Sequence, residues 1–299
     1  MTPRLASAVL ALFLAACPGD GPSDVDIGGT GDTALSDLAP SDLEPADGTT
    51  DALPLDLAPD APAPDQAADL DGDGIADALE ATLAKKYFPY YSLAPKDKCP
   101  RHGVLYRLTK HPGDAAKIMI WYVVLYEKDC GALGHVGDAE VFGALVDPTK
   151  PPPAGLLALR AISHYGTLCQ KKTTCGSLPG CSACTTAKRG SQMWPVVFSS
   201  VNKHGGYVSE KTCDLNFLCD LGGCTLNSTP SAPPMVNAGE PGKPLVTDLT
   251  TQGFITPKNG WTETALKNFN PWSSKKFVTA GVVKDDLTDK AFVVSPSGC

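Results

Sequence analysis

Short apolar runs separated by turn residues set the fold class of this 299-residue chain. The runs are rich in β-branched and aromatic side chains, a composition that favours strands over helices. They lie at 104–108, 118–126, 141–146, 156–162, 194–198 and 277–283, with turns at 111–114, 151–153 and 258–260. The pattern predicts a mainly β fold, an antiparallel β-sandwich formed by residues 85–299 with a short N-terminal helix.

Eleven cysteines add a second constraint. Ten of them follow Cys17: Cys99, Cys130, Cys169, Cys175, Cys181, Cys184, Cys213, Cys219, Cys224 and Cys299. An even number in an exported chain predicts up to five disulfides, most of them in a cysteine-rich insert at about 169–224. Cys181 and Cys184 also have the spacing of a redox or zinc motif, which is the alternative to disulfides that staple loops.

The N-terminus has the features of a targeting segment. Arg4 precedes a short apolar stretch at 5–14, which is too short to span a membrane, so residues 1–16 are predicted to be a signal peptide. Residues 14–17, Leu-Ala-Ala-Cys, resemble the lipobox of bacterial lipoproteins. This resemblance implies a lipid on Cys17 that anchors the protein in the bacterial cell envelope, at the outer membrane or cell surface. The alternative is an ordinary signal peptide followed by an incidental cysteine.

Residues 17–66 have the composition of a spacer. They are rich in Asp, Pro and Ala and contain no aromatic residue, so they cannot bury enough apolar surface to fold and are predicted to be a disordered tether. Residues 18–84 hold 17 of the 33 acidic groups, so 16 remain in the body. The body also holds 24 of the 25 basic groups, all except Arg4, and therefore carries a net positive charge. A basic body favours an anionic partner such as lipid headgroups or an acidic glycan. Basic runs interleaved with aromatic residues are absent from the sequence, which argues against nucleic acid.

Residues 67–84 contain a pattern typical of calcium loops. A twelve-residue loop has carboxylates at its first, third, fifth, ninth and twelfth positions and glycine at its sixth, Gly74. The predicted ligands are Asp69, Asp71, Asp73, the carbonyl of Ile75, Asp77 and Glu80. A helix is expected from about residue 76 to 87. The loop resembles the EF-hand-like half-sites of thrombospondin type 3 and dockerin repeats, which implies a structural Ca²⁺.

A second acidic group lies at 134–140, which reads GHVGDAE. On a strand, Asp138 and Glu140 point to the same face, and two adjacent carboxylates repel each other unless a cation or a shared proton lies between them. With His135 on the preceding turn, the group predicts a site for a divalent cation or a polar substrate. The alternative is a solvated strand face.

Several segments resemble, in order along the chain, proteins related to vacuolar protein sorting-associated protein 62. That family has an "LAxxYxP" opening, paired early strands, a "GHxGDWE" motif and a later strand that ends in "HxxY". The corresponding segments are LAKKYFP at 83–89, the runs at 104–108 and 118–126, GHVGDAE at 134–140 and PVVFSSVNKHGGY at 195–207. The resemblance covers about residues 83–210 and favours one β-sandwich domain.

The same motif resembles, more distantly, the "GHRHDWE" motif of necrosis- and ethylene-inducing-peptide-like proteins, which are secreted β-sandwich toxins. That resemblance implies a divalent-cation site formed by Asp129, His135, Asp138 and Glu140. Two motif positions differ, because Gly137 replaces the second His and Ala139 replaces the Trp. His204 is a further candidate for ligand or substrate contact, or a histidine that bonds backbone at a strand end.

These features predict a surface-tethered, calcium-binding lipoprotein whose β-sandwich binds a second divalent cation and an anionic lipid or glycan. One alternative is a metal-assisted hydrolase of glycans or phosphoesters, with His135, Asp138, Glu140 and His204 as its candidate catalytic residues. Another alternative is a membrane-damaging protein like the necrosis-inducing toxins. The sequence contains no phosphate-binding glycine loop, Gly-x-Ser-x-Gly elbow or His-Glu-x-x-His helix.

Overall fold

The computed structural model describes residues 68–100, 102–132, 134, 136–164, 168–216, 218–240 and Cys299. Several predictions lie outside these residues: the signal peptide, the lipidated Cys17, the tether, the strand at 277–283, the turn at 258–260 and His135. In the part of the chain that is described, no helix is long and apolar enough to cross a membrane.

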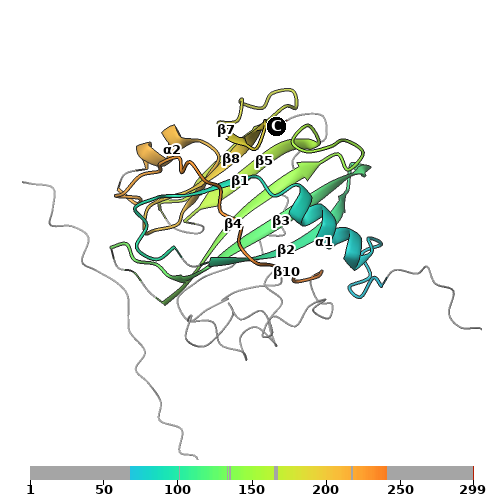
Figure 1. The fold of residues 1–299 in the computed structure, drawn as a ribbon, viewed down its shortest axis with the longest axis horizontal. Helices are drawn as coiled ribbons and strands as arrows, with labels where there is room; N and C mark the ends of the chain where they lie inside the picture. Colours follow the sequence, from blue (N-terminus) through green and yellow to red (C-terminus); the bar gives the residue numbers. More distant parts are fainter. Residues whose placement is uncertain are drawn as a thin grey trace, which may run out of the picture. The chain divides into compact units, whose positions relative to one another are not determined.

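Two α-helices and ten β-strands form the described chain (Figure 1). Their order is α1 (Asp77–Lys86), β1 (Tyr90–Leu93), β2 (His102–His111), β3 (Asp114–Lys128), β4 (Val136–Val146), β5 (Leu156–Ser163), β6 (Lys171–Gly176), β7 (Thr186–Arg189), β8 (Gln192–Ser199), β9 (Gly206–Tyr207), α2 (Glu210–Leu215) and β10 (Met235–Asn237). The predicted runs at 104–108, 118–126, 141–146, 156–162 and 194–198 all lie in strands, β2 to β5 and β8.

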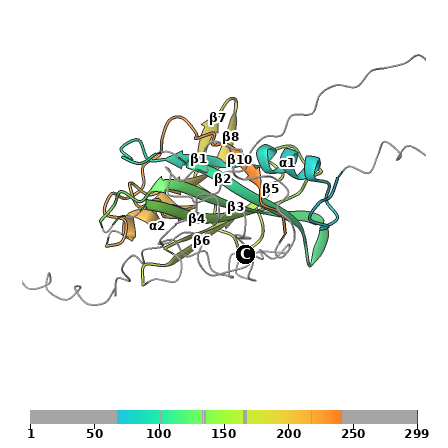
Figure 2. The ribbon, with the colours of Figure 1, turned by 90° about the horizontal axis from the view of Figure 1, so that it is seen from below.

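The strands form two sheets (Figures 1 and 2). One has the order β10-β2-β3-β4-β5-β6, and the other has β1-β8-β7 with β9 also paired to β8. Most pairs are antiparallel, which confirms the predicted mainly antiparallel β-sandwich. Two edge pairs, β1 with β8 and β10 with β2, are parallel. Each joins strands far apart in the chain, and parallel pairs require such long connections.

Aromatic side chains fill the space between the sheets. Alternate residues of β3 point into this core, including Tyr122, because side chains of a strand alternate between its two faces. The Tyr122 ring lies 4.9 Å from that of Phe142 and 5.2 Å from that of Phe88, and Phe142 also stacks on Tyr91 at 5.8 Å. Helix α1 therefore packs beside a continuous aromatic core.

Helix α1 agrees with the helix predicted at about 76–87. Its acidic groups lie in the first turn and Lys85 and Lys86 in the last, the arrangement that the helix dipole favours. Leu83 and Ala84 are buried against the sandwich. The Tyr122 hydroxyl donates a hydrogen bond to the carbonyl of Ala84, near the C-terminal end of α1, at 2.9 Å. This bond fixes α1 to β3 and thereby positions the loop that precedes the helix.

All ten cysteines that follow Cys17 form disulfides. The pairs are Cys99–Cys130, Cys169–Cys219, Cys175–Cys184, Cys181–Cys299 and Cys213–Cys224. The five predicted disulfides are therefore confirmed. Cys181 and Cys184 have different partners, so the alternative of a redox or zinc motif is wrong. The cysteine-rich segment at 169–224 also supplies strands to both sheets.

The bond between Tyr122 and Ala84 provides a test of how α1 is held. Tyr122→Phe leaves a buried carbonyl without its donor, and we expect a loss of about 1–3 kcal/mol in the free energy of unfolding, measured in urea. Tyr106→Phe is the matched control, because Tyr106 faces Tyr122 across β2 and β3 but its hydroxyl makes no hydrogen bond to the described residues. Equal losses in the two variants would contradict the assignment.

Candidate functional site

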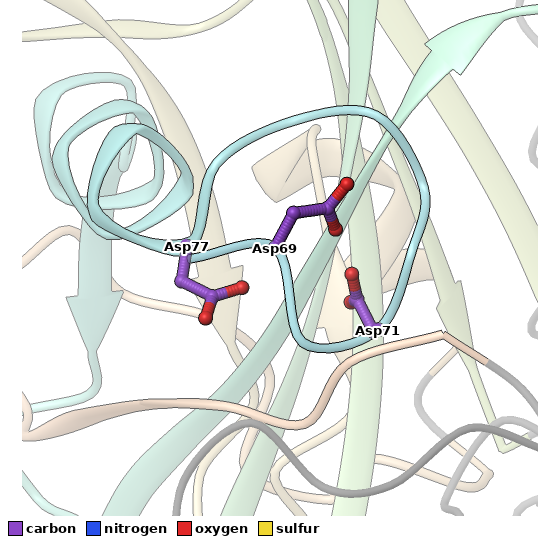
Figure 3. Close-up of side chains that lie close together, drawn as sticks. All are labelled: Asp69, Asp71 and Asp77. Atoms are coloured by element: carbon purple, nitrogen blue, oxygen red, sulfur yellow. The ribbon is translucent and has the colours of Figure 1, made fainter. Parts of the chain in front are cut away.

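The predicted calcium loop forms a closed turn before α1. The carboxylates of Asp69, Asp71 and Asp77 have oxygens within 4.8 Å of one another (Figure 3). Among the described residues, no other group of three or more acidic, His or Cys side chains comes this close. Gly74 has a φ of +83°, a left-handed conformation that glycine adopts without strain, at the loop's sixth position. Three consecutive backbone N–H groups, at residues 72–74, donate to Asp69.

Several carboxylate oxygens of this loop lack hydrogen bonds. Both oxygens of Asp71, Oδ2 of Asp73 and Oε1 of Glu80 are buried and accept no hydrogen bond from the described residues. Burial raises the pKa of Glu80 to about 8, even though Asn237 donates a hydrogen bond to it, and burial raises that of Asp73 to about 6. Calcium binds hard oxygen ligands of this kind, and the donor set of the loop therefore fits Ca²⁺.

A buried histidine forms the centre of a second group of charges. The imidazole of His204 lies between two carboxylates, with Nδ1 3.0 Å from Asp138 Oδ2 and Nε2 3.2 Å from Asp97 Oδ2. Its ring stacks on Tyr126 with centroids 3.7 Å apart. Asn202 and His204 both have left-handed backbones, with φ of +63° and +59°, which turn the imidazole into the protein.

The two carboxylates determine the charge of this histidine. Burial alone would lower the pKa of His204, but the hydrogen bonds and negative charges of Asp138 and Asp97 raise it to about 9. Burial also opposes ionisation of Asp97, yet the hydrogen bond with His204 holds the pKa of Asp97 below its ordinary value. His204 is therefore an imidazolium at neutral pH. One predicted alternative was a histidine that bonds backbone at a strand end, but the imidazole bonds two carboxylates instead.

The predicted carboxylate pair on β4 is buried. Asp138 and Glu140 are each 8% exposed, so the alternative of a solvated strand face is wrong. His204 provides a positive charge beside Asp138, which offsets part of the repulsion between the two carboxylates. Burial, followed by the charge of Asp138, raises the pKa of Glu140 well above its ordinary value.

Asp129 is the other described residue of the predicted second cation site. Asp129 forms an ion pair with Lys203 at 2.7 Å, and its Oδ1 also accepts the N–H of Gly131. His135 lies outside the described residues. A second divalent cation bound by Asp129, His135, Asp138 and Glu140 stays a prediction.

A further buried carboxylate, Asp220, was not among the predicted site residues. It is bonded by His164 at 2.8 Å and by the hydroxyls of Ser200 and Tyr207, and it thus joins the ends of β5, β8 and β9. The residues that pattern analysis missed, Asp97, Lys203 and Asp220, share one property. Each lies in a loop beside a cysteine, a turn or a glycine pair, where no periodicity indicates burial.

A cavity of about 590 Å³ lies beside this charge network. Its polar lining comes from His164, Asn202 and Lys203, and its apolar lining includes Leu218 and Leu221. Lys203 runs directly over Gly131, where a Cβ would come within 2.6 Å of its methylene carbons. The cavity therefore combines a basic group with apolar walls, a lining suited to an anionic, partly apolar ligand.

Comparisons with known proteins give structural similarity only. No family model matches the chain, and no curated protein is significantly similar to it. A solved structure described as "Toxin fold for microbial attack and plant defense" is 15% identical, covering 72% of this chain and 89% of that chain, with a TM-score of 0.34. The structure of NLPPya in complex with glucosamine is 16% identical, covers 71% of this chain and 87% of that chain, and has a TM-score of 0.37. The structure of NLPPya in complex with mannosamine is 15% identical, covers 71% of this chain and 88% of that chain, and has the same TM-score. These neighbours are necrosis- and ethylene-inducing-type toxin folds, and at such values their function does not transfer to this chain.

The raised pKa of His204 predicts a loss of stability at alkaline pH. The pKa rises from 6.5 in the unfolded chain to about 9, so the stabilisation is complete below pH 6.5 and is lost as the pH rises through 9. In Asp97→Asn, one carboxylate is removed, and we expect a lower Tm below pH 6.5 and a weaker dependence of Tm on pH between 6.5 and 9. Asp114→Asn, in the β2–β3 hairpin, should keep the wild-type pH dependence in the same circular dichroism melts. A wild-type Tm that stays constant over this range would contradict the assignment.

Proposed function

We propose that this protein is a lipid-tethered, calcium-binding β-sandwich of the bacterial cell envelope that recognises an anionic lipid or glycan. Two observations on the loop before α1 carry the proposal. The carboxylates of Asp69, Asp71 and Asp77 converge, and buried oxygens of Asp71, Asp73 and Glu80 accept no hydrogen bond from the described residues. The proposal of a lipid anchor rests on the lipobox-like sequence at 14–17, which lies outside the described residues. Binding of a second cation near Asp138 is a separate part of the proposal.

The calcium part follows from the cost of buried charge. Asp71 and Glu80 are 1% and 0% exposed, and carboxylates at such depth are unstable without a proton or a cation. The loop supplies carboxylates at five of the positions that calcium loops use, and Ile75 is at the position whose carbonyl binds the ion. Ca²⁺ would use Asp69, Asp71, Asp73, the Ile75 carbonyl, Asp77 and Glu80. Its role would be structural, since it lies where the chain enters the sandwich through α1.

Metal analysis of the purified full chain tests this part. We expect Asp71→Asn combined with Glu80→Gln to lose one bound Ca²⁺ per chain, measured by atomic emission after gel filtration, because the variant removes two of the ligand charges. Asp138→Ala combined with Glu140→Ala is the second arm, and it should lose a different cation if the second site exists. Unchanged stoichiometry in the first variant would disprove the calcium loop. Unchanged stoichiometry in the second would remove only the second cation.

The ligand part rests on the cavity and on the apolar side chains around it. Four leucines near the Cys169–Cys219 disulfide are 71–100% exposed. They are Leu168, Leu215, Leu218 and Leu221. Exposed apolar groups gathered in one place indicate a surface that contacts lipid or protein. Since Leu218 and Leu221 also line the cavity that contains Lys203, an anionic headgroup and an apolar chain could be bound together.

Vesicle binding tests this part of the proposal. The full chain should sediment with vesicles of phosphatidylcholine and phosphatidylglycerol, and more weakly with phosphatidylcholine alone. Leu218→Ser combined with Leu221→Ser should weaken binding roughly tenfold or more, since burial of one leucine contributes about 1.5–3 kcal/mol. Lys203→Ala should reduce the preference for the anionic lipid, and its Tm is measured as well because the variant also removes the partner of Asp129. Lys188→Ala, an exposed lysine on β7, is the matched control.

The same variants separate the remaining alternatives. Binding to an acidic polysaccharide that depends on Lys203 but not on the leucines would assign a glycan in place of a lipid. Release of an enclosed dye from the vesicles would favour the membrane-damaging alternative. Failure to bind vesicles and polysaccharide alike would overturn the ligand part and leave the calcium part intact.

A further inference from the structure

The calcium loop contacts a strand from the other end of the described chain. Asn237, in β10, donates its side-chain amide to Glu80 Oε2 at 2.6 Å, while Oε1 of the same carboxylate accepts no hydrogen bond from the described residues. Asn237 is 3% exposed, and its side-chain oxygen Oδ1 accepts a hydrogen bond from the N–H of Gly239 at 3.0 Å. The amide is therefore held in one orientation, and it fixes the carboxylate at the loop's twelfth position.

Strand β10 is a short edge strand. It is three residues long and, within the described part of the chain, pairs with β2 alone at the edge of the six-stranded sheet. The flanking hydrogen bonds join Val104 to Pro234 and Ala238 to Tyr106. Short edge strands of this kind are weakly held by their backbone bonds alone. The hydrogen bond from Asn237 to Glu80 therefore adds an attachment to these backbone bonds and to the burial of Val236 and Ala238.

Charge links the same two parts of the molecule. Glu240, three residues after Asn237, pairs with Arg107 at 3.4 Å, and the guanidinium of Arg107 lies over the ring of Trp121 at 4.3 Å. Burial raises the pKa of Glu240 to about 7, against the effect of Arg107, and the negative charges of Asp73 and Asp71 add to the rise. Acidic groups of the loop thus act on the segment that follows β10, and a cation in the loop would relieve this repulsion.

We infer that β10 belongs to the calcium site, with Asn237 as the residue that positions Glu80, and that calcium binding and the docking of β10 stabilise each other. This inference rests on the proposed calcium loop. A carboxylate oxygen has two lone pairs, so Glu80 Oε2 can bind the ion and still accept the Asn237 amide. Such outer partners orient metal ligands and raise affinity, and thermodynamic linkage makes the effect reciprocal.

Calcium titration of the full chain tests the positioning role. The protein is stripped with EDTA and titrated with CaCl₂ by isothermal calorimetry. Asn237→Ala should weaken calcium binding about 10–100-fold, the range found when outer partners of metal ligands are removed. Asn227→Ala is the matched control: its amide donates to the carbonyl of Leu93, away from the loop. The control should lower Tm and leave the calcium affinity unchanged.

Hydrogen exchange of the wild-type protein tests the reciprocal effect without any variant. The N–H of Ala238, bonded to the carbonyl of Tyr106, should exchange more slowly with Ca²⁺ than without it. The N–H of Cys213, which is buried in α2, should show little change. Calcium binding by Asn237→Ala that equals wild type, or equal exchange of Ala238 with and without Ca²⁺, would overturn the inference while the calcium loop stands. Absence of calcium binding by the wild-type protein would overturn both.

Discussion

Each carboxylate that this β-sandwich buries requires a proton, a hydrogen-bond donor or a cation, and the rest of the structure is arranged around that requirement. Near α2, the protein supplies the cations itself: His204 lies between Asp97 and Asp138, and Lys203 pairs with Asp129. The predicted calcium loop, before α1, lies at the opposite end of the sandwich from α2 in both views (Figures 1 and 2). There several carboxylate oxygens have no such partner among the described residues, and a cation from solution would balance their negative charge.

The fold could be predicted from the sequence where its signals are local. Runs of β-branched and aromatic residues identified β2 to β5 and β8, since each is long enough to show the pattern. Helix α1 was also predicted, and three carboxylates of the loop before it converge, because their spacing is fixed by a single turn of chain. That they bind Ca²⁺ stays a prediction. The shorter strands β1, β6, β7, β9 and β10 were missed. They contain two to six residues and owe their conformation to neighbouring strands more than to their own composition.

The charges around His204 could be predicted from the sequence only in part. The sequence indicated that Asp138 and Glu140 would face the same way and would need a counter-charge. It could not show that the charge comes from His204, 66 positions later, or that Asp97 lies on the other side of the same ring. Such pairs are made by the packing of loops, held here by the Cys99–Cys130 disulfide. Their residues carry no periodic signal that a pattern could detect.

The hydrogen bond between Glu80 and Asn237 joins residues 157 positions apart. The predicted calcium loop is contiguous in sequence, yet the carboxylate at its twelfth position accepts a hydrogen bond from a strand much further along the chain. Contacts of such long range form late, because the entropy of closing a long loop must first be overcome. A product truncated before β10 would therefore carry every predicted ligand and lack the residue that orients the last of them.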